Sequence, residues 1–197
     1  MPNLCSNTIV IDGEKAQLDI LKEKLNKIIL EDKYIMNTLL FDQEQDSETW
    51  YEDNLKNLGT KWDFKANDDS NIEIQEESID IIVWTAWSPP INFLHNLCKK
   101  FGVQATIIYE EPGCDFCGKT DIDEDGNIND DCCGYHEGLY KYSENFWSAV
   151  QDDAEWNHAE YTEEEFVARY PFVEEKEIQD IRDLYHKAKE NAEKETE

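Results

Sequence analysis

Basic residues are scarce in this chain. Its 197 residues include 18 Lys and Arg against 46 Asp and Glu, which gives a formal net charge of −28 at pH 7. A surface of that sign repels nucleic acid and anionic membranes, and it attracts cationic surfaces over about 10 Å at 0.1 M salt. We therefore expect no direct nucleic-acid binding, and the expected partner is a protein with a basic surface.

Long apolar runs and catalytic motifs are missing as well. No stretch approaches the ~20 apolar residues that cross a membrane, and residues 1–7 lack the basic and apolar regions of a secretory signal. We therefore expect a cytoplasmic protein without a membrane role, whose six cysteines are thiols or metal ligands rather than disulfides. Because G-x-S-x-G, P-loop, G-x-G-x-x-G and H-E-x-x-H motifs are all lacking, we expect no enzyme.

The apolar periodicity predicts an α+β fold. Residues 6–12, 72–75, 79–87 and 103–109 have the composition of strands, whereas residues 14–30 and 91–101 have helical periodicity. This order of strand, helix, strand, strand, helix, strand is the split βαβ plan of a ferredoxin-like sandwich. Ser88 is the expected N-cap of the second helix.

Two further segments complete the predicted organisation. Residues 42–71 are polar but contain aromatic residues, which we expect to reach the core, and the state of residues 34–41 stays ambiguous. We predict one domain over residues 1–141, which ends in a Cys-rich hairpin, and an acidic helical extension over residues 142–197. In that extension, Thr162 to Glu165 form a capping box, and a last helix runs from about Glu174.

Four separated segments carry a family resemblance. They are Met1–Thr8, Leu58–Asp63, Thr85–Pro90 and Tyr109–Gly113, the last followed by Phe116 and Gly118. In this order they resemble the YubB-type family of uncharacterised phage and plasmid proteins. The resemblance covers about residues 1–140, and it implies a ferredoxin-like fold and an origin in a phage or other mobile element, but no reaction. The chain departs from the family pattern at Leu4, where the family usually has Trp, and the Cys-rich end and acidic tail lie outside the pattern.

A cluster of cysteines predicts a structural zinc site. Cys114 and Cys117 form a C-x-x-C turn followed by a glycine, and a hairpin would return Cys132 or Cys133 to it, with His136 as the fourth ligand. Adjacent cysteines point different ways in an extended chain, so only one of the two is expected to ligate, and Cys132 is the one assigned. Unligated thiols and a redox pair remain open as alternatives.

The same hairpin contains a partial calcium motif. Asp121, Asp123 and Asp125, followed by Gly126, match the start of an EF-hand loop, but Cys132 stands where the bidentate Glu is needed. Calcium is therefore not expected, and metal analysis of the purified protein distinguishes zinc, calcium and neither.

The leading functional hypothesis is an acidic interaction protein of a phage or other mobile element. It would bind a host protein and inhibit a nucleic-acid-handling defence system by mimicking nucleic acid. The predicted contact residues are Asp121, Asp123, Glu124, Asp125, Asp130, Asp131, Asp152, Asp153, Glu163 and Glu164.

Two alternatives stay open. One is a small enzyme that uses Trp87 and Glu110, and the other is a zinc-stapled accessory protein with no inhibitory role. Trp62, Trp84 and Trp87 are expected to pack in the core, and their alternative role is to line a groove for a partner.

Overall fold

The structure, a computed structural model, describes residues 3–42, 49–66 and 70–195. The chain divides into two compact units, Met1–Cys132 and Cys133–Glu197. The division falls before the predicted position at residue 141. The reason is that α5 (Tyr135–Tyr142) packs against α6 (Phe146–Asn157), which makes it part of the second unit.

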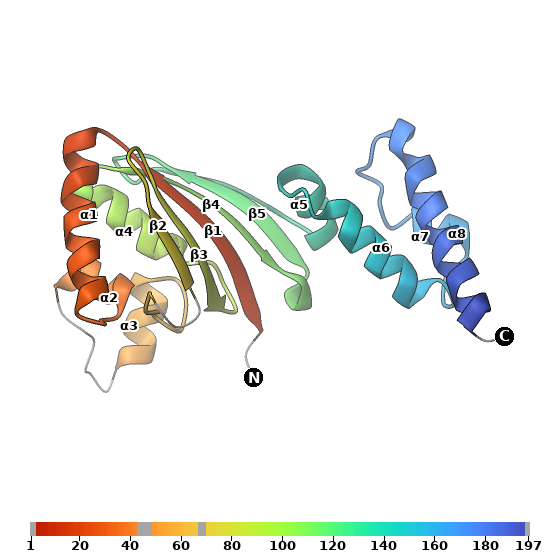
Figure 1. The fold of residues 1–197 in the computed structure, drawn as a ribbon, viewed down its shortest axis with the longest axis horizontal. Helices are drawn as coiled ribbons and strands as arrows, with labels where there is room; N and C mark the ends of the chain where they lie inside the picture. Colours follow the sequence, from red (N-terminus) through yellow and green to blue (C-terminus); the bar gives the residue numbers. More distant parts are fainter. Residues whose placement is uncertain (1–2, 43–48, 67–69, 196–197) are drawn as a thin grey trace. The chain divides into compact units, whose positions relative to one another are not determined.

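The first unit is built on an antiparallel sheet, which has six strands within the described residues (Figure 1). The strand order is β2-β3-β1-β4-β5-β6. The strands are β1 (Leu4–Asp12), β2 (Ser70–Ile74), β3 (Ile79–Ala86), β4 (Gln104–Glu111), β5 (Phe116–Ile122) and β6 (Ile128–Cys133). β1 pairs antiparallel with both β3 and β4, which agrees with the predicted split βαβ plan, and the additional helices α2 and α3 lie between α1 and β2 in the chain. β5 and β6 extend the sheet beyond β4.

Helices cover one face of this sheet (Figure 1). They are α1 (Lys15–Leu30), α2 (Ile35–Phe41), α3 (Trp50–Asn57) and α4 (Ile91–Phe101). Alternate strand residues such as Ile9, Ile81 and Ile107 are buried against Leu21 and Leu94 of these helices. The other face carries exposed apolar side chains, among them Val10, Ile82 and Trp84. The expectation of core packing is therefore wrong for Trp84, which is 47% exposed.

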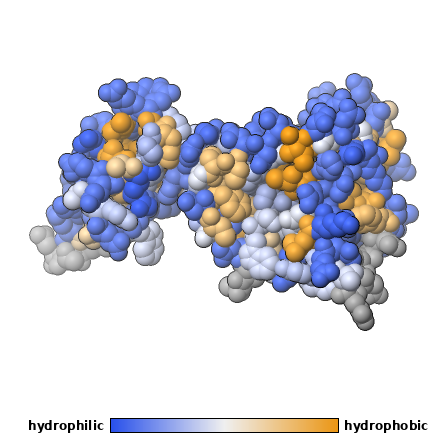
Figure 2. Space-filling view, turned by 180° about the vertical axis from the view of Figure 1, so that it is seen from behind, coloured by the Kyte–Doolittle hydropathy of each residue, from blue (hydrophilic) through white to orange (hydrophobic). Residues whose placement is uncertain are grey.

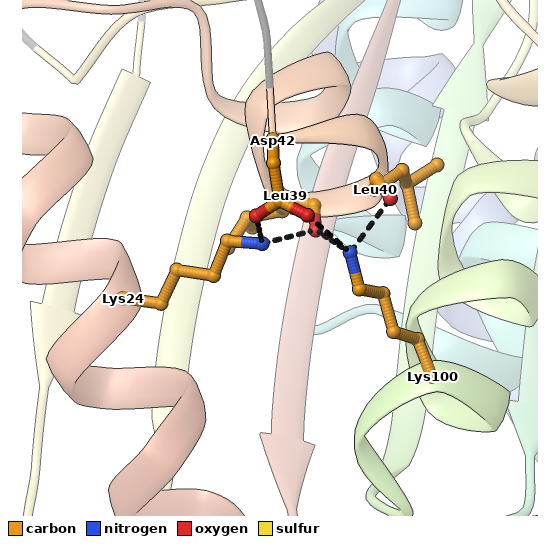
Figure 3. Close-up of polar contacts among 5 residues, drawn as sticks. All are labelled: Lys24, Leu39, Leu40, Asp42 and Lys100. Atoms are coloured by element: carbon orange, nitrogen blue, oxygen red, sulfur yellow. Dashed lines mark hydrogen bonds and ion pairs between the residues drawn. The ribbon is translucent and has the colours of Figure 1, made fainter.

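Two lysines from neighbouring helices hold the C-terminal end of α2 (Figure 3). Lys24 on α1 donates to the Leu39 carbonyl at 2.9 Å, and Lys100 on α4 donates to the carbonyls of Leu39 at 2.9 Å and Leu40 at 2.7 Å. Both ammonium groups also pair with Asp42, which ends the helix in a left-handed conformation at φ 60°. Cations at a helix C-terminus stabilise its unpaired carbonyl groups, so this contact explains why an apolar stretch is a helix here.

The second unit is helical. After α5 and α6 come α7 (Glu163–Val167), the short 3-10 turn η2 (Glu175–Glu177) and α8 (Ile178–Glu195). Its core contains the packed rings of Phe146, Phe166, Tyr170 and Tyr185. The predicted capping box at Thr162 is confirmed.

Hydrophilic residues cover most of the visible surface of each unit, and hydrophobic residues gather in separate patches (Figure 2). Among the helices that the structure describes, none has the length and apolar character needed to cross a bilayer.

We predict that Asp42→Asn destabilises the first unit in a pH-dependent way. Hydrogen bonds from Lys24 and then Lys100 lower the pKa of Asp42 below its ordinary 3.8. A lowered pKa in the folded state means that the stabilisation is present above that ordinary value and is lost as pH falls through the folded-state pKa. Urea unfolding should therefore show a lower midpoint for the variant at pH 7, and the difference should shrink on acidification.

Asp19→Asn is the matched control for this prediction. It removes one ion pair to Lys15 within α1 that holds no helix end in place, so the midpoint should change little at any pH. Equal unfolding midpoints of wild type and Asp42→Asn at pH 7 would contradict the assigned role of the two lysines.

Candidate functional site: an aromatic–lysine cluster

Hydrogen bonds join three of the four family-like segments at one end of the sheet. The buried Asn7 amide on β1 donates to the Val83 carbonyl at 3.0 Å and the Thr85 hydroxyl at 2.9 Å. Thr85 donates in turn to the Ser88 carbonyl at 2.7 Å. The Ser88 hydroxyl donates to the Gly59 carbonyl at 2.7 Å instead of capping α4, so the N-cap prediction for Ser88 is wrong.

The segment after α3 is fixed by further contacts. Its Thr60 hydroxyl donates to the Ala86 carbonyl at 3.1 Å, and its Leu58 carbonyl accepts from the Phe93 amide at 3.1 Å. Gly59 has φ +82°, and a Cβ there would lie 3.3 Å from the Asn92 nitrogen, so glycine is required at this position. The chain around Lys61 and Trp62 is therefore held rigidly against the body of the first unit.

Asp63 ties the same segment to the N-terminus of α2. Its carboxylate accepts bonds from the amides of Met36, Asn37 and Phe64, each at 2.8 Å, and from the Asn37 side chain at 3.0 Å. Burial raises the pKa of Asp63, while these four donors act in the opposite direction. All four partners are N–H donors, and a protonated carboxyl would turn an O–H toward them, so the arrangement holds the anion.

Lys61 lies among three aromatic rings. Its ammonium is 5.1 Å from the ring centre of Trp87, 5.4 Å from that of Trp62 and 5.5 Å from that of Tyr51. Each such cation–π contact contributes about 0.5–1 kcal/mol at an exposed site. The rings of Trp50 and Tyr51 are nearly perpendicular, with their centres 5.9 Å apart.

An adjoining cavity extends this arrangement. It has a volume of about 320 Å³ and is lined by Tyr34, Asn37, Trp50, Asn54, Trp62 and Asp63. We call Lys61 and the rings of Tyr34, Trp50, Tyr51, Trp62 and Trp87 the aromatic–lysine cluster. All five rings are between 39% and 44% exposed. The cluster is therefore an accessible aromatic surface on a rigid base.

Trp87 adopts a strained backbone conformation within this cluster. Its φ is 68°, a region that a bulky side chain rarely occupies and that costs about 1–2 kcal/mol. The amide of Trp87 donates to the Asn3 carbonyl at 3.0 Å, which holds it in this conformation. Such strain persists only where surrounding contacts enforce it, and it often marks functional sites.

The expectation that the aromatics of residues 42–71 pack in the core is wrong for Trp50, Tyr51 and Trp62, and it is also wrong for Trp87. Leu58 and Phe64 supply the buried apolar side chains of this stretch, which leaves the larger rings at the surface. Residues 43–48 and 67–69 of the same stretch lie outside the described residues. The adjacent pair Lys61 and Trp62 was the sequence signal for a mixed aromatic and cationic surface.

At least five of the ten predicted partner-binding acids make internal contacts. Asp121 accepts from Thr106 at 2.7 Å, Asp130 accepts from Tyr109 at 2.8 Å, and Asp123 closes a turn by accepting from Asn127 at 2.8 Å. The contacts of Asp121 and Asp123 lower the pKa of both carboxyls.

Asp153 and Glu163 have similar roles in the second unit. Asp153 is 10% exposed and accepts two bonds from Arg169 at 3.2 Å and one from Tyr170. Glu163 pairs with Arg182 and with His186. The exposed members of the predicted set are Glu124, Asp125, Asp130, Asp131, Asp152 and Glu164, of which Asp130 also accepts the Tyr109 bond.

The predicted zinc ligands belong to both units of the chain. Cys114 is exposed on the 3-10 turn η1 (Pro112–Cys114), Cys117 is buried, and Cys132 is exposed on β6. His136 belongs to the second unit, where it packs against the rings of Tyr135 and Tyr170 at 5.3 Å. Within the described part of the chain, no three His, Cys, Asp or Glu side chains form a group that could hold a metal ion. Zinc therefore remains a sequence prediction.

Glu110 and Trp87 do not form a joint site in the structure. Glu110 lies opposite Ser6 in the β1–β4 register, and burial raises its pKa. No hydrogen bond or ring contact joins it to Trp87 in the ranges that the structure describes. The neighbouring Glu111 is buried and accepts from the Gly113 amide at 3.0 Å.

Comparison with known proteins supports the fold. Residues 61–132 match the family model described as the ferredoxin-like domain in Api92-like protein. The match begins at Lys61 and runs through β2, β3, α4, β4 and β5 into β6. It supports the ferredoxin-like part of the resemblance, while the YubB-type assignment stays an expectation.

A crystal structure of a protein api92 from Yersinia pseudotuberculosis is also similar, with a TM-score of 0.47 and 9% sequence identity. The likeness covers 68% of this chain and 99% of that one. No curated protein matches the chain.

We predict that Asp63→Ala lowers the free energy of unfolding by about 2–5 kcal/mol, because it leaves four N–H donors without their acceptor. Asp32→Asn is the control. It removes an exposed charge that pairs with Lys65 and keeps a residue that tolerates the positive φ of 53° at this position, so it should cost less than about 1 kcal/mol. Urea unfolding of both variants tests this, and equal losses would show that Asp63 does not anchor the cluster.

Proposed function

We propose that this chain is a non-catalytic binding protein whose partner is a protein with a basic surface. The aromatic–lysine cluster is the main contact in this proposal, and the surplus negative charge guides the encounter. The single observation that carries the proposal is the gathering of five exposed rings on one hydrogen-bonded base.

Exposed rings in such a group suit protein recognition. Trp and Tyr are enriched among the few residues that supply most of the binding energy of interfaces. Their rings also bury a large area at little cost in side-chain entropy, especially on a base that does not rearrange. The contacts of Thr60, Ser88 and Asp63 provide that base.

The charge of the chain supports a basic partner. The net charge of −28 acts on other molecules, and several of the few cations, such as Lys24 and Lys100 at Asp42, are paired with carboxylates of the chain itself. Such a field speeds association with a basic protein and weakens as salt is added. Exposed acids such as Glu124, Asp125 and Asp152 contribute to it.

A more specific form of this proposal follows from the family resemblance. The partner would be a host enzyme that handles nucleic acid, and the chain would occupy its basic groove. Competition between the chain and DNA for the captured partner tests this form separately from binding itself.

We predict that Trp87→Gly weakens partner binding by about tenfold or more while it changes stability by less than about 1 kcal/mol. The substitution removes a ring of the cluster but places glycine where φ is positive, so the strain that it relieves offsets the contact that it loses. The measurement is the affinity of the partner captured from host lysate at low salt, together with urea unfolding of the variant.

Trp156→Ala is the matched control, because Trp156 is 84% exposed and lies in the second unit. It should bind the partner as wild type does. The proposal would be contradicted if Trp87→Gly bound the partner with unchanged affinity, or if the affinity of wild type for the partner stayed constant as salt is raised.

A further inference from the structure

The cavity beside Lys61 has the chemistry of a site for a planar cation. Three of its lining side chains are the exposed rings of Tyr34, Trp50 and Trp62. The other three are polar, namely Asn37, Asn54 and Asp63. Among the described residues, its lining contains carboxamide and carboxylate oxygens but no Lys or Arg.

The rings at this cavity already attract cations. The ammonium of Lys65 lies 5.3 Å from the ring centre of Tyr34, and that of Lys61 lies 5.4 Å from that of Trp62. Lys65 is also paired with Asp32 at 3.1 Å. These two lysines show that the electron-rich faces of the cavity rings stabilise positive charge in this setting.

The floor of the cavity adds a negative potential. Asp63 is held as an anion by its four N–H donors, so it acts on a ligand through its charge rather than through a further hydrogen bond. The Asn54 side-chain oxygen accepts one bond, from Asn37 at 3.1 Å, and keeps a second lone pair for a ligand. Asn54 donates to the Lys61 carbonyl at 2.8 Å, which fixes its orientation.

We propose that this cavity receives the side chain of an arginine from the basic partner, an inference that rests on the proposed function. A guanidinium is planar, stacks on Trp and Tyr, and presents several N–H donors to oxygen acceptors. The cavity volume of about 320 Å³ accommodates this side chain. The net charge of −28 favours a cationic occupant over a nucleotide, which is the other planar ligand that aromatic walls accept.

A substitution at Lys61 can test whether the ligand of the cavity is positively or negatively charged. Its ammonium shares the Trp62 ring, and it repels a guanidinium in the cavity. Lys61→Met should therefore tighten arginine binding by about threefold or more, because it removes one nearby positive charge. The same variant should weaken binding of an anionic nucleotide.

The experiment titrates the full chain with N-acetyl-arginine amide and follows the indole N–H signals by NMR. We expect saturable shifts of the Trp50 and Trp62 signals at millimolar ligand, with the Trp156 signal unmoved. N-acetyl-citrulline amide has nearly the same shape without the charge, and it should bind at least about tenfold more weakly. Trp50→Ala and Tyr34→Ala should abolish the shifts, and Trp156→Ala should leave them intact.

Three results would overturn the inference. They are equal binding of the arginine and citrulline amides, weaker arginine binding in Lys61→Met, and saturable binding of adenosine monophosphate in place of arginine. Normal urea midpoints of Trp50→Ala and Tyr34→Ala verify that lost binding does not reflect unfolding.

Partner capture separates this inference from the proposed function. Trp50 and Tyr34 line the cavity without contacting Lys61, whereas Trp87 contacts Lys61 and lies outside the cavity lining. Suppose that Trp87→Gly no longer captures the partner, while Trp50→Ala and Tyr34→Ala still capture it. This result would overturn the arginine site but not the proposed binding function. The opposite result is that the cavity binds the arginine amide but no captured partner depends on the aromatic–lysine cluster. This result would overturn the proposed binding function but not the arginine site.

Discussion

The carboxylate of Asp63 is the contact on which the candidate site depends. It gathers the amides at the start of α2 and so anchors the segment that carries Lys61 and Trp62. The lysines at the other end of α2 complete the placement of this helix between α1 and α4 (Figure 3). A short apolar helix is thus held at both ends by charge, and the exposed rings beside it gain a fixed geometry.

The charge of the chain has two roles that its composition does not distinguish. Asp63, Asp123 and Asp153 are used inside the units, where they satisfy backbone amides or pair with an arginine. Glu124 and Asp152 remain exposed and contribute to the external field. In the proposed function, the negative surplus provides long-range attraction, and recognition is assigned to the exposed rings and to one buried anion.

Strands β1 to β4 could be predicted from local patterns, whereas β5 and β6 were not predicted as members of the sheet. The alternation of Ile79 to Trp84 places Ile79, Ile81 and Val83 on the buried face, and Gly102 ends α4 in the left-handed conformation that a glycine favours. The site could not be predicted in the same way. Its geometry depends on partners distant in sequence, such as Ser88 with Gly59, and on a positive φ at a tryptophan. The sequence also does not distinguish an acidic residue whose side chain closes a turn from one whose side chain faces solvent.

The most direct test of the central claim is hydrogen–deuterium exchange of the full chain with and without its captured partner. If the aromatic–lysine cluster is the contact, exchange should slow in α3 and in the segment Leu58–Asp63, while α8 exchanges as in the unbound chain. Protection confined to the second unit, with α3 and Leu58–Asp63 unchanged, would contradict the account.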